Sequence, residues 1–239
     1  MNDHTRAVPA QVARLGEYFA LRAALGGGWQ PVAALLEPAT LQERAATTQH
    51  AIAGFSGADP ADVPLRVAAS SLQMAIASRL ISPALGSVVA VQRAPLLTPA
   101  SLRWRTADHS VQFGAADLQW RDVDGPANAA ALIAETLLGG VLATLTERMH
   151  STLALSPQVM WGNVMSAANG AVTVLGLTDP SLVAAGRRLI TALSRTAPLR
   201  DTAVTDAGNF RRRSCCLFYQ APHGGLCGDC VLQGAPPSH

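Results

Sequence analysis

All four cysteines of this 239-residue chain lie between Cys215 and Cys230, and no cysteine precedes them. A chain of this length buries enough apolar surface to fold without covalent cross-links. The long cysteine-free part must therefore rely on a hydrophobic core. A disulfide scaffold would distribute its cysteines through a short secreted chain. The concentration of thiols predicts a metal site in the C-terminal part of the sequence instead.

The composition indicates a globular chain. Hydrophobic residues make up 49% and charged residues only 14%, which excludes an intrinsically disordered protein. Much of the apolar content is alanine, so the mean hydropathy of +0.21 is not a membrane signal. The longest apolar stretch, residues 129–145, is interrupted by Glu135 and falls short of the roughly 20 residues that span a bilayer. We expect no integral membrane segment.

Charge and the first residues narrow the class further. The net charge of +2 leaves no basic surplus of the kind that binds nucleic acid, so we expect no nucleic-acid partner. The sequence opens without the basic residues and apolar block of a secretory signal. We therefore expect a cytoplasmic protein.

Apolar residues recur at three- and four-residue spacing through most of residues 1–199, which predicts a helical body. The first helix is expected to end at the triple glycine 26–28. A serine followed by proline at 82–83 has the pattern of an N-cap and a first helical residue, and predicts the start of a separate short helix. The other expected helices span residues 38–55 and 65–81, or begin at Gly125-Pro126, Ser156-Pro157 and Asp179-Pro180.

Residues 101–122 differ from this pattern because apolar and polar residues alternate, with a turn at 108–110. The alternation predicts a small β-hairpin or meander, the only strand region that we expect, inserted in the helical body. Residues 200–239 lose their periodicity and are rich in glycine and proline. The sequence thus predicts a mainly α fold with a small β-hairpin (α+β) over residues 1–199, followed by a loop-rich, metal-binding segment over 200–239.

The cysteines have the spacing C-C-x10-C-x2-C, formed by Cys215, Cys216, Cys227 and Cys230. Four thiolates can complete a tetrahedral zinc site or the terminal positions of an iron–sulfur cluster. The Cys-x2-Cys turn can present two sulfurs to one metal centre. Adjacent side chains diverge in an extended chain, and structural zinc sites usually space paired cysteines two to four residues apart. The Cys-Cys pair therefore favours a [2Fe–2S] cluster, and a zinc-stabilised binding module is the alternative.

The arginine run 211–213, the Cys-Cys pair, the ten-residue gap and the Cys-Gly-Asp-Cys ending resemble the C-terminal signature of the FhuF-type ferric-siderophore reductase family. The segment Trp161-Gly162-Asn163 is similar to the family's Trp-Gly-Asn helix. Val231 departs from the pattern, which has proline after the last cysteine. The resemblance covers the cysteine region and, more weakly, the 150s to 170s, whereas residues 1–120 show none.

The resemblance implies a [2Fe–2S] cluster on Cys215, Cys216, Cys227 and Cys230 and one-electron reduction of a cytoplasmic ferric siderophore. Oxygen donors hold Fe(III) tightly and Fe(II) far less well, so a single electron releases the iron. The sequence has no dinucleotide fingerprint, and the electron donor is expected to be a ferredoxin or reduced flavin. An iron–sulfur electron carrier or redox sensor without a siderophore site is the alternative.

Three arginines directly precede the cysteines. Arg211, Arg212 and Arg213 would compensate for the negative charge of the cluster or dock an anionic substrate or redox partner, or else form a solvated basic run. His223 lies in the ten-residue gap and offers an alternative ligand, although four cysteines already complete the set.

The tryptophans have two interpretations. Trp161 and its neighbour Asn163 would line a siderophore pocket, or would be a core tryptophan beside a helix-capping residue, and the core interpretation is favoured. Trp104 and Trp120, in the predicted hairpin, are expected to be packing residues. The substrate-binding residues are otherwise unassigned.

Overall fold

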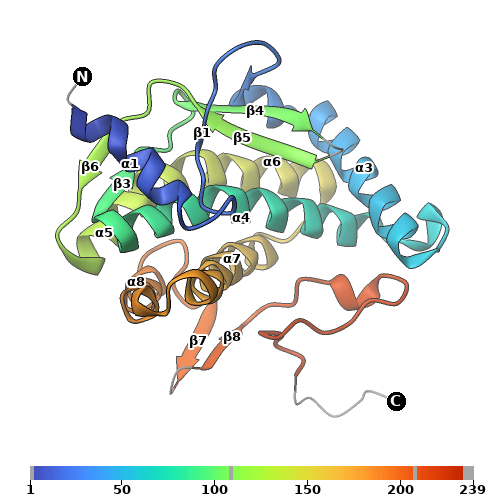
Figure 1. The fold of residues 1–239 in the computed structure, drawn as a ribbon. Coiled ribbons are helices and arrows are strands. Elements are labelled where there is room, and N and C mark those ends of the chain that lie inside the picture. Colours follow the sequence, from blue (N-terminus) through green and yellow to red (C-terminus); the bar gives the residue numbers. More distant parts are fainter. Residues whose placement is uncertain (1–2, 108–109, 207–208, 234–239) are drawn as a thin grey trace.

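The computed structural model describes residues 3–107, 110–206 and 209–233 (Figure 1). Helices form most of the fold and the strands are short, which confirms the predicted mainly helical α+β class. A small sheet lies on one side of the long helix α4 (Leu65–Val91), and helices α7 (Pro157–Thr178) and α8 (Val183–Leu193) lie on the other. The chain after α8 continues along α7 on the side away from the sheet.

Helix α4 is the centre of the fold and is buried over most of its length. Its residues are mostly small or aliphatic, so it packs against helices on several sides. These are α1 (Asp3–Ala13), α3 (Pro38–Ser56), α6 (Ala143–Leu153), α7 and α8. The predicted helix start at Ser82-Pro83 is wrong, because α4 continues through both residues. Proline removes one helical hydrogen bond, but both residues are buried, and packing holds the helix together.

The N-terminal region is less helical than predicted. Helix α1 ends at Ala13, well before the triple glycine, and turns lead to the two-residue strands β1 (Arg22–Ala23) and β2 (Gln30–Pro31). The short helix α2 (Val32–Leu35) leads into α3, which matches its predicted span, and the 3-10 helix η1 (Pro60–Asp62) leads into α4.

The predicted hairpin is present. Strands β4 (Leu102–Ala107) and β5 (Ser110–Ala115) pair antiparallel, and turn residues 108–109 lie outside the described part of the chain. Strands β1 and β2 join their outer edges in the order β1-β5-β4-β2, while β3 (Arg93–Pro95) pairs with β6 (Trp120–Asp122). The prediction of one strand region is therefore wrong, because strands of two or three residues are too short to show an alternating pattern.

The later helices begin where the proline-containing starts predict. Helix α5 (Gly125–Ile133) continues through a π-helical segment (Ala134–Leu142) into α6; α7 starts at Pro157, and the 3-10 helix η3 (Pro180–Leu182) leads into α8. Helix α4 and the helix Gly125–Leu153 are long and apolar enough to cross a membrane, but 61% and 56% of their apolar windows are buried inside the fold. Both belong to the core, as in a soluble protein.

Beyond α8 the chain forms a second hairpin that the sequence did not predict. Strands β7 (Ala203–Asp206) and β8 (Asn209–Arg212) pair antiparallel, and a loop with the 3-10 helix η4 (Phe218–Gln220) follows. The segment after residue 200 is loop-rich as predicted, but it also contains this short hairpin. The boundary predicted between residues 199 and 200 stays a prediction.

Candidate metal centre

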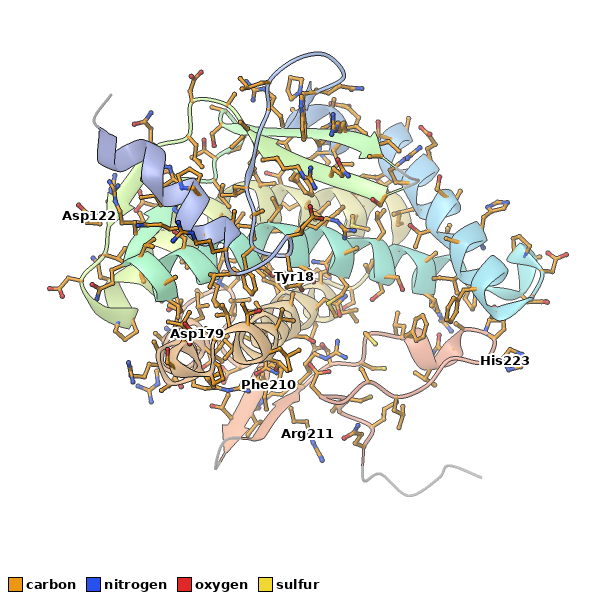
Figure 2. All side chains as sticks on the ribbon, in the orientation of Figure 1. Tyr18, Asp122, Asp179, Phe210, Arg211 and His223 are labelled. Atoms are coloured by element: carbon orange, nitrogen blue, oxygen red, sulfur yellow. The ribbon has the colours of Figure 1, made fainter. Side chains whose placement is uncertain are left out.

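The end of strand β8 separates the three arginines. Arg212 is buried, with 1% of its surface exposed, whereas Arg211 and Arg213 are exposed. Successive side chains of an extended chain point to opposite sides, so only the middle arginine faces the fold. Figure 2 shows Arg211 directed away from the body. The sequence analysis assigned the three arginines one shared role, whereas the structure separates them into two exposed cations and one buried cation.

Arg212 is held on three sides. Its Nη1 donates a hydrogen bond to Asn163 Oδ1 (3.0 Å), and its Nη2 donates to Cys227 Sγ. Its Nε lies 3.2 Å from Asp229 Oδ2, an ion pair without the alignment of a hydrogen bond. Burial lowers the pKa of Arg212, but Asp229 and the nearby sulfurs outweigh it and raise that pKa above its usual value. The guanidinium therefore stays charged inside the fold.

Asn163 connects this arginine to the core. It is buried on α7, and its Nδ2 donates to Ser70 Oγ and to Gln73 Oε1, both at 3.0 Å, on α4. Its Oδ1 accepts from Arg212, so both ends of the amide are satisfied, as buried polar groups require. The helix-capping interpretation of Asn163 is wrong. The residue joins α4, α7 and the end of β8.

Gly162 allows the chain after β8 to lie directly against α7. A Cβ atom at this position would lie 2.1 Å from Ser214 Oγ and 3.4 Å from Ser214 Cβ. One helical turn further, Ser166 Oγ donates to Asp229 Oδ2 at 2.5 Å. Gly162, Asn163 and Ser166 therefore form a docking surface, the α7 platform, for the cysteine segment (residues 213–233).

Two of the four sulfurs lie close together: Cys216 Sγ and Cys227 Sγ are 3.6 Å apart. The other two cysteines, Cys215 and Cys230, make up the second pair. Two thiolates on one tetrahedral metal with bonds of about 2.3 Å lie about 3.8 Å apart, so the first pair has the separation of two ligands of one metal. We expected the Cys-x2-Cys turn to present both of its sulfurs to one centre, but Cys227 meets Cys216 across the ten-residue gap.

Two pairs fit a two-iron cluster better than one zinc ion. Among the described residues, no three histidine, cysteine or acidic side chains converge as the ligands of one metal ion do. A zinc site needs four ligands around one point, whereas each iron of a [2Fe–2S] cluster needs two protein ligands. All four cysteines are free thiols, and thus available as ligands.

Hydrogen bonds reach several of the sulfurs, and together with the charge of Arg212 they favour the thiolate form of Cys216. The N–H groups of Leu217 and Leu232 lie 3.3 and 3.4 Å from the sulfurs of Cys215 and Cys230. Burial raises the pKa of Cys216, but the Phe218 N–H and Arg212 lower it more, so its net shift is downward. Burial and the neighbouring Cys216 raise the pKa of Cys227 to about 12, although Arg212 opposes them.

The thiol of Cys215 is perturbed mainly by burial, which raises its pKa. Arg212 therefore acts chiefly on the other pair, where it stabilises a negative charge on Cys216.

An apolar cavity of about 500 Å³ opens beside Cys216 and Cys227. Helix α4 and the cysteine segment form its walls, and its lining includes Met74, Phe218 and Leu226. Cys216 and Cys227 are half-buried, whereas Cys230 is 1% exposed. The site thus has an accessible side at the first sulfur pair and a buried sulfur, that of Cys230, in the second.

The other predicted residues lie outside this cavity. Trp161 is half-buried and packs against the hydrophobic core, which agrees with the core interpretation. Trp104 is buried and Trp120 packs on the core, so their predicted packing role is confirmed. His223 is exposed at an outer turn of the cysteine segment (Figure 2).

Residues 212–232 match the family model described as FhuF 2Fe-2S C-terminal domain. This segment is similar to a FhuF-type [2Fe–2S] domain. The match includes the four cysteines together with Arg212 and Asp229, and it confirms both the resemblance and the [2Fe–2S] cofactor. The chain is therefore an iron–sulfur protein. It matches no curated protein sequence.

Sequence reasoning missed two residues of the site, Asp229 within this domain and Ser166 on α7. Asp229 appeared only as part of the Cys-Gly-Asp-Cys turn, and Ser166 was not considered. An acidic residue between two ligands, close to a basic run, is a usable signal for an internal ion pair. The contact between Ser166 and Asp229 spans most of the last third of the chain and leaves no local signal.

Proposed function

We propose that the protein reduces ferric siderophores by one electron in the cytoplasm and thereby releases Fe(II). The observation that carries the proposal is the FhuF-type domain combined with the open position of Cys216 and Cys227 at the cavity. Four cysteines in one short segment, with the spacing of metal ligands rather than of a disulfide scaffold, suit a reducing compartment.

In this proposal Cys216 and Cys227, whose sulfurs are 3.6 Å apart, hold one iron, which leaves Cys215 and Cys230 to hold the other. The bound cluster supplies one electron at a time, and Fe(III) needs only one to lose its tight binding to oxygen donors. The residues around it bind and orient the cluster and need no general acid or base.

The accessible side of the site supports electron transfer to a bulky chelate. A ferric siderophore is too large to enter a packed core, so electron transfer requires ligands close to the surface. Cys216 and Cys227 meet this requirement because they line the open cavity. The exposed Arg211 and Arg213 offer positive charge to an anionic chelate or to an electron donor such as a ferredoxin. Reduced flavin is the other donor that we propose.

The test uses cluster-loaded protein, reduced with dithionite, freed of excess reductant and kept under anaerobic conditions. It is mixed with ferric hydroxamate, catecholate and carboxylate chelates in separate experiments. We expect the visible spectrum to return to that of the oxidised cluster, with Fe(II) appearing in a ferrous trap. Metal-free protein, treated in the same way, serves as the control.

The result also decides between the candidate functions. If no chelate of the three classes reoxidises the protein and no Fe(II) is trapped, the reductase function is wrong. Rapid electron exchange with a ferredoxin in that case would instead support an electron carrier, and its absence a redox sensor.

A further inference from the structure

We infer that Arg212 is the positioning residue that sets the reduction potential of the cluster, and that it acts through Cys216 and Cys227, whereas its neighbours Arg211 and Arg213 do not. The inference rests on the cysteine ligands proposed above but not on the siderophore as substrate. It assigns separate roles to three residues that are identical in type and adjacent in sequence.

The first step is the position of the charges. Arg212 is buried and in contact with Cys227, and it also interacts with Cys216. Arg211 and Arg213 extend into solvent. A charge interaction is several times stronger inside a protein than in water, and exposed charges are further screened by salt. Of the three cations, only Arg212 therefore acts on the sulfurs at close range.

The second step concerns the direction of the effect. Reduction adds one negative charge to the bound cluster and its thiolates. A fixed cation beside those thiolates stabilises the more negative state and so raises the reduction potential. Removing the cation must lower the potential.

The third step compares the two sulfur pairs. Cys215 and Cys230 face the backbone N–H groups of Leu217 and Leu232, which are neutral donors. The Arg212 guanidinium brings a full positive charge to Cys227, whereas a backbone N–H group brings only a dipole. The more positive side of the site is therefore the side of Cys216 and Cys227, which also faces the cavity.

The fourth step is how the cation is kept in place. The Asp229 carboxylate pairs with the Arg212 guanidinium and accepts a hydrogen bond from Ser166 Oγ. The Asp229 backbone carbonyl accepts the Arg212 backbone N–H at 3.0 Å. Asn163 accepts a hydrogen bond from Arg212 Nη1 and donates one to Gln73 on α4. Asp229 is negative and close, so it opposes the effect of Arg212 on the potential. The two residues should thus shift the potential in opposite directions.

The experiment measures the reduction potential of cluster-loaded variants by anaerobic spectroelectrochemical titration. Arg212→Gln keeps hydrogen-bond donors but removes the charge; Arg211→Gln and Arg213→Gln make the same charge change at exposed positions. We expect Arg212→Gln to lower the equilibrium constant for reduction at least tenfold, which is about 59 mV for one electron. The two controls should change it less than about twofold, an effect that salt removes.

Asp229→Asn gives the opposite sign and separates tuning from a merely structural role. This variant should raise the potential, because it removes a negative charge beside the same sulfurs. If Arg212→Gln loses its cluster, Arg212→Lys, which keeps the charge, and Asp229→Asn decide the question. A potential for Arg212→Lys close to wild type, together with a higher one for Asp229→Asn, supports the inference.

Two results overturn it. One is a shift of the reduction potential in Arg211→Gln or Arg213→Gln as large as that in Arg212→Gln, because the net charge of the whole arginine run would then set the potential. The other is a potential for Asp229→Asn that is unchanged or lower than wild type. The titration uses no siderophore, so the inference about Arg212 would still stand if the reductase proposal failed. A full-strength cluster in Cys216→Ser would instead show that the ligand assignment is wrong.

Discussion

Replacing Gly162 by alanine tests whether the cysteine segment must lie directly against α7. The new Cβ would lie 2.1 Å from Ser214 Oγ, far inside normal contact distance. Ser214 is buried, and its Oγ has no hydrogen-bond partner among the described residues. Either the hydroxyl rotates within a packed space or the segment moves away from the helix.

The cost can be estimated from packing. Extra atoms in a well-packed contact cost about 1–3 kcal/mol. Helix α7 also packs along α4, so the strain falls on the cysteine segment rather than on the body. A change of about 1–3 kcal/mol corresponds to about 5- to 150-fold in an equilibrium constant. We expect the segment of Gly162→Ala to open more often by this factor, and the cluster to be lost correspondingly faster.

The assay follows the loss of visible absorption after excess iron chelator is added to anaerobic, cluster-loaded protein, while circular dichroism reports the helical body. Gly170→Ala is the matched control, because it makes the same substitution on α7 where a Cβ meets nothing within 4 Å. The double variant Gly162→Ala/Ser214→Ala removes the clashing oxygen and leaves Ser214 Cβ at 3.4 Å, an ordinary contact. It should lose its cluster at nearly the wild-type rate.

The reasoning fails if Gly162→Ala loses its cluster no faster than Gly170→Ala. It also fails if the double variant remains as unstable as Gly162→Ala, because the strain would then not come from the Ser214 hydroxyl.

Two further predictions concern the cysteines. Replacing any one of the four by serine should remove or destabilise the cluster and its visible absorption, while the helical circular dichroism signal remains. A full-strength visible spectrum in any of these variants would exclude the replaced residue as a ligand. In metal-free protein, Cys216 should be alkylated at lower pH than Cys227, because Arg212 and the Phe218 N–H lower the pKa of Cys216 whereas burial raises that of Cys227 to about 12. Mass spectrometry of peptides from a pH series measures the order of labelling. Labelling of Cys227 at lower pH than Cys216 would contradict the prediction.

The parts of the fold that the sequence predicted have local causes. Proline at or beside the first helical position placed the starts of α5, α7 and η3, because its fixed backbone angle and missing N–H suit that position. The same signal failed at Pro83, where tertiary packing along α4 outweighs the local preference for a helix start. The strands β1, β2 and β3 escaped detection because they depend on partners distant in sequence.

In the candidate site, too, the sequence predicted the features that have local patterns and missed those that depend on distant residues. The cysteine spacing is a local pattern and indicated the cluster directly. Distinguishing Arg212 from Arg211 and Arg213 required knowing that β8 ends at Arg212, and the sequence predicted no strand in this loop-rich segment. The role of Asn163 depends on two helices and a strand meeting at one point, which no window of the sequence contains.

The contacts of the cysteine segment also bear on how the protein is made and maintained. Ser214 and Asp229 rest on α7, and Arg66 at the start of α4 donates to Gln220 in η4. Both helices precede the cysteines along the chain, so they leave the ribosome before the thiols do. Iron–sulfur delivery to the folded protein therefore meets a loop that the helical body tethers. Loss of the cluster under iron starvation would likewise leave a folded protein that can be reloaded instead of replaced.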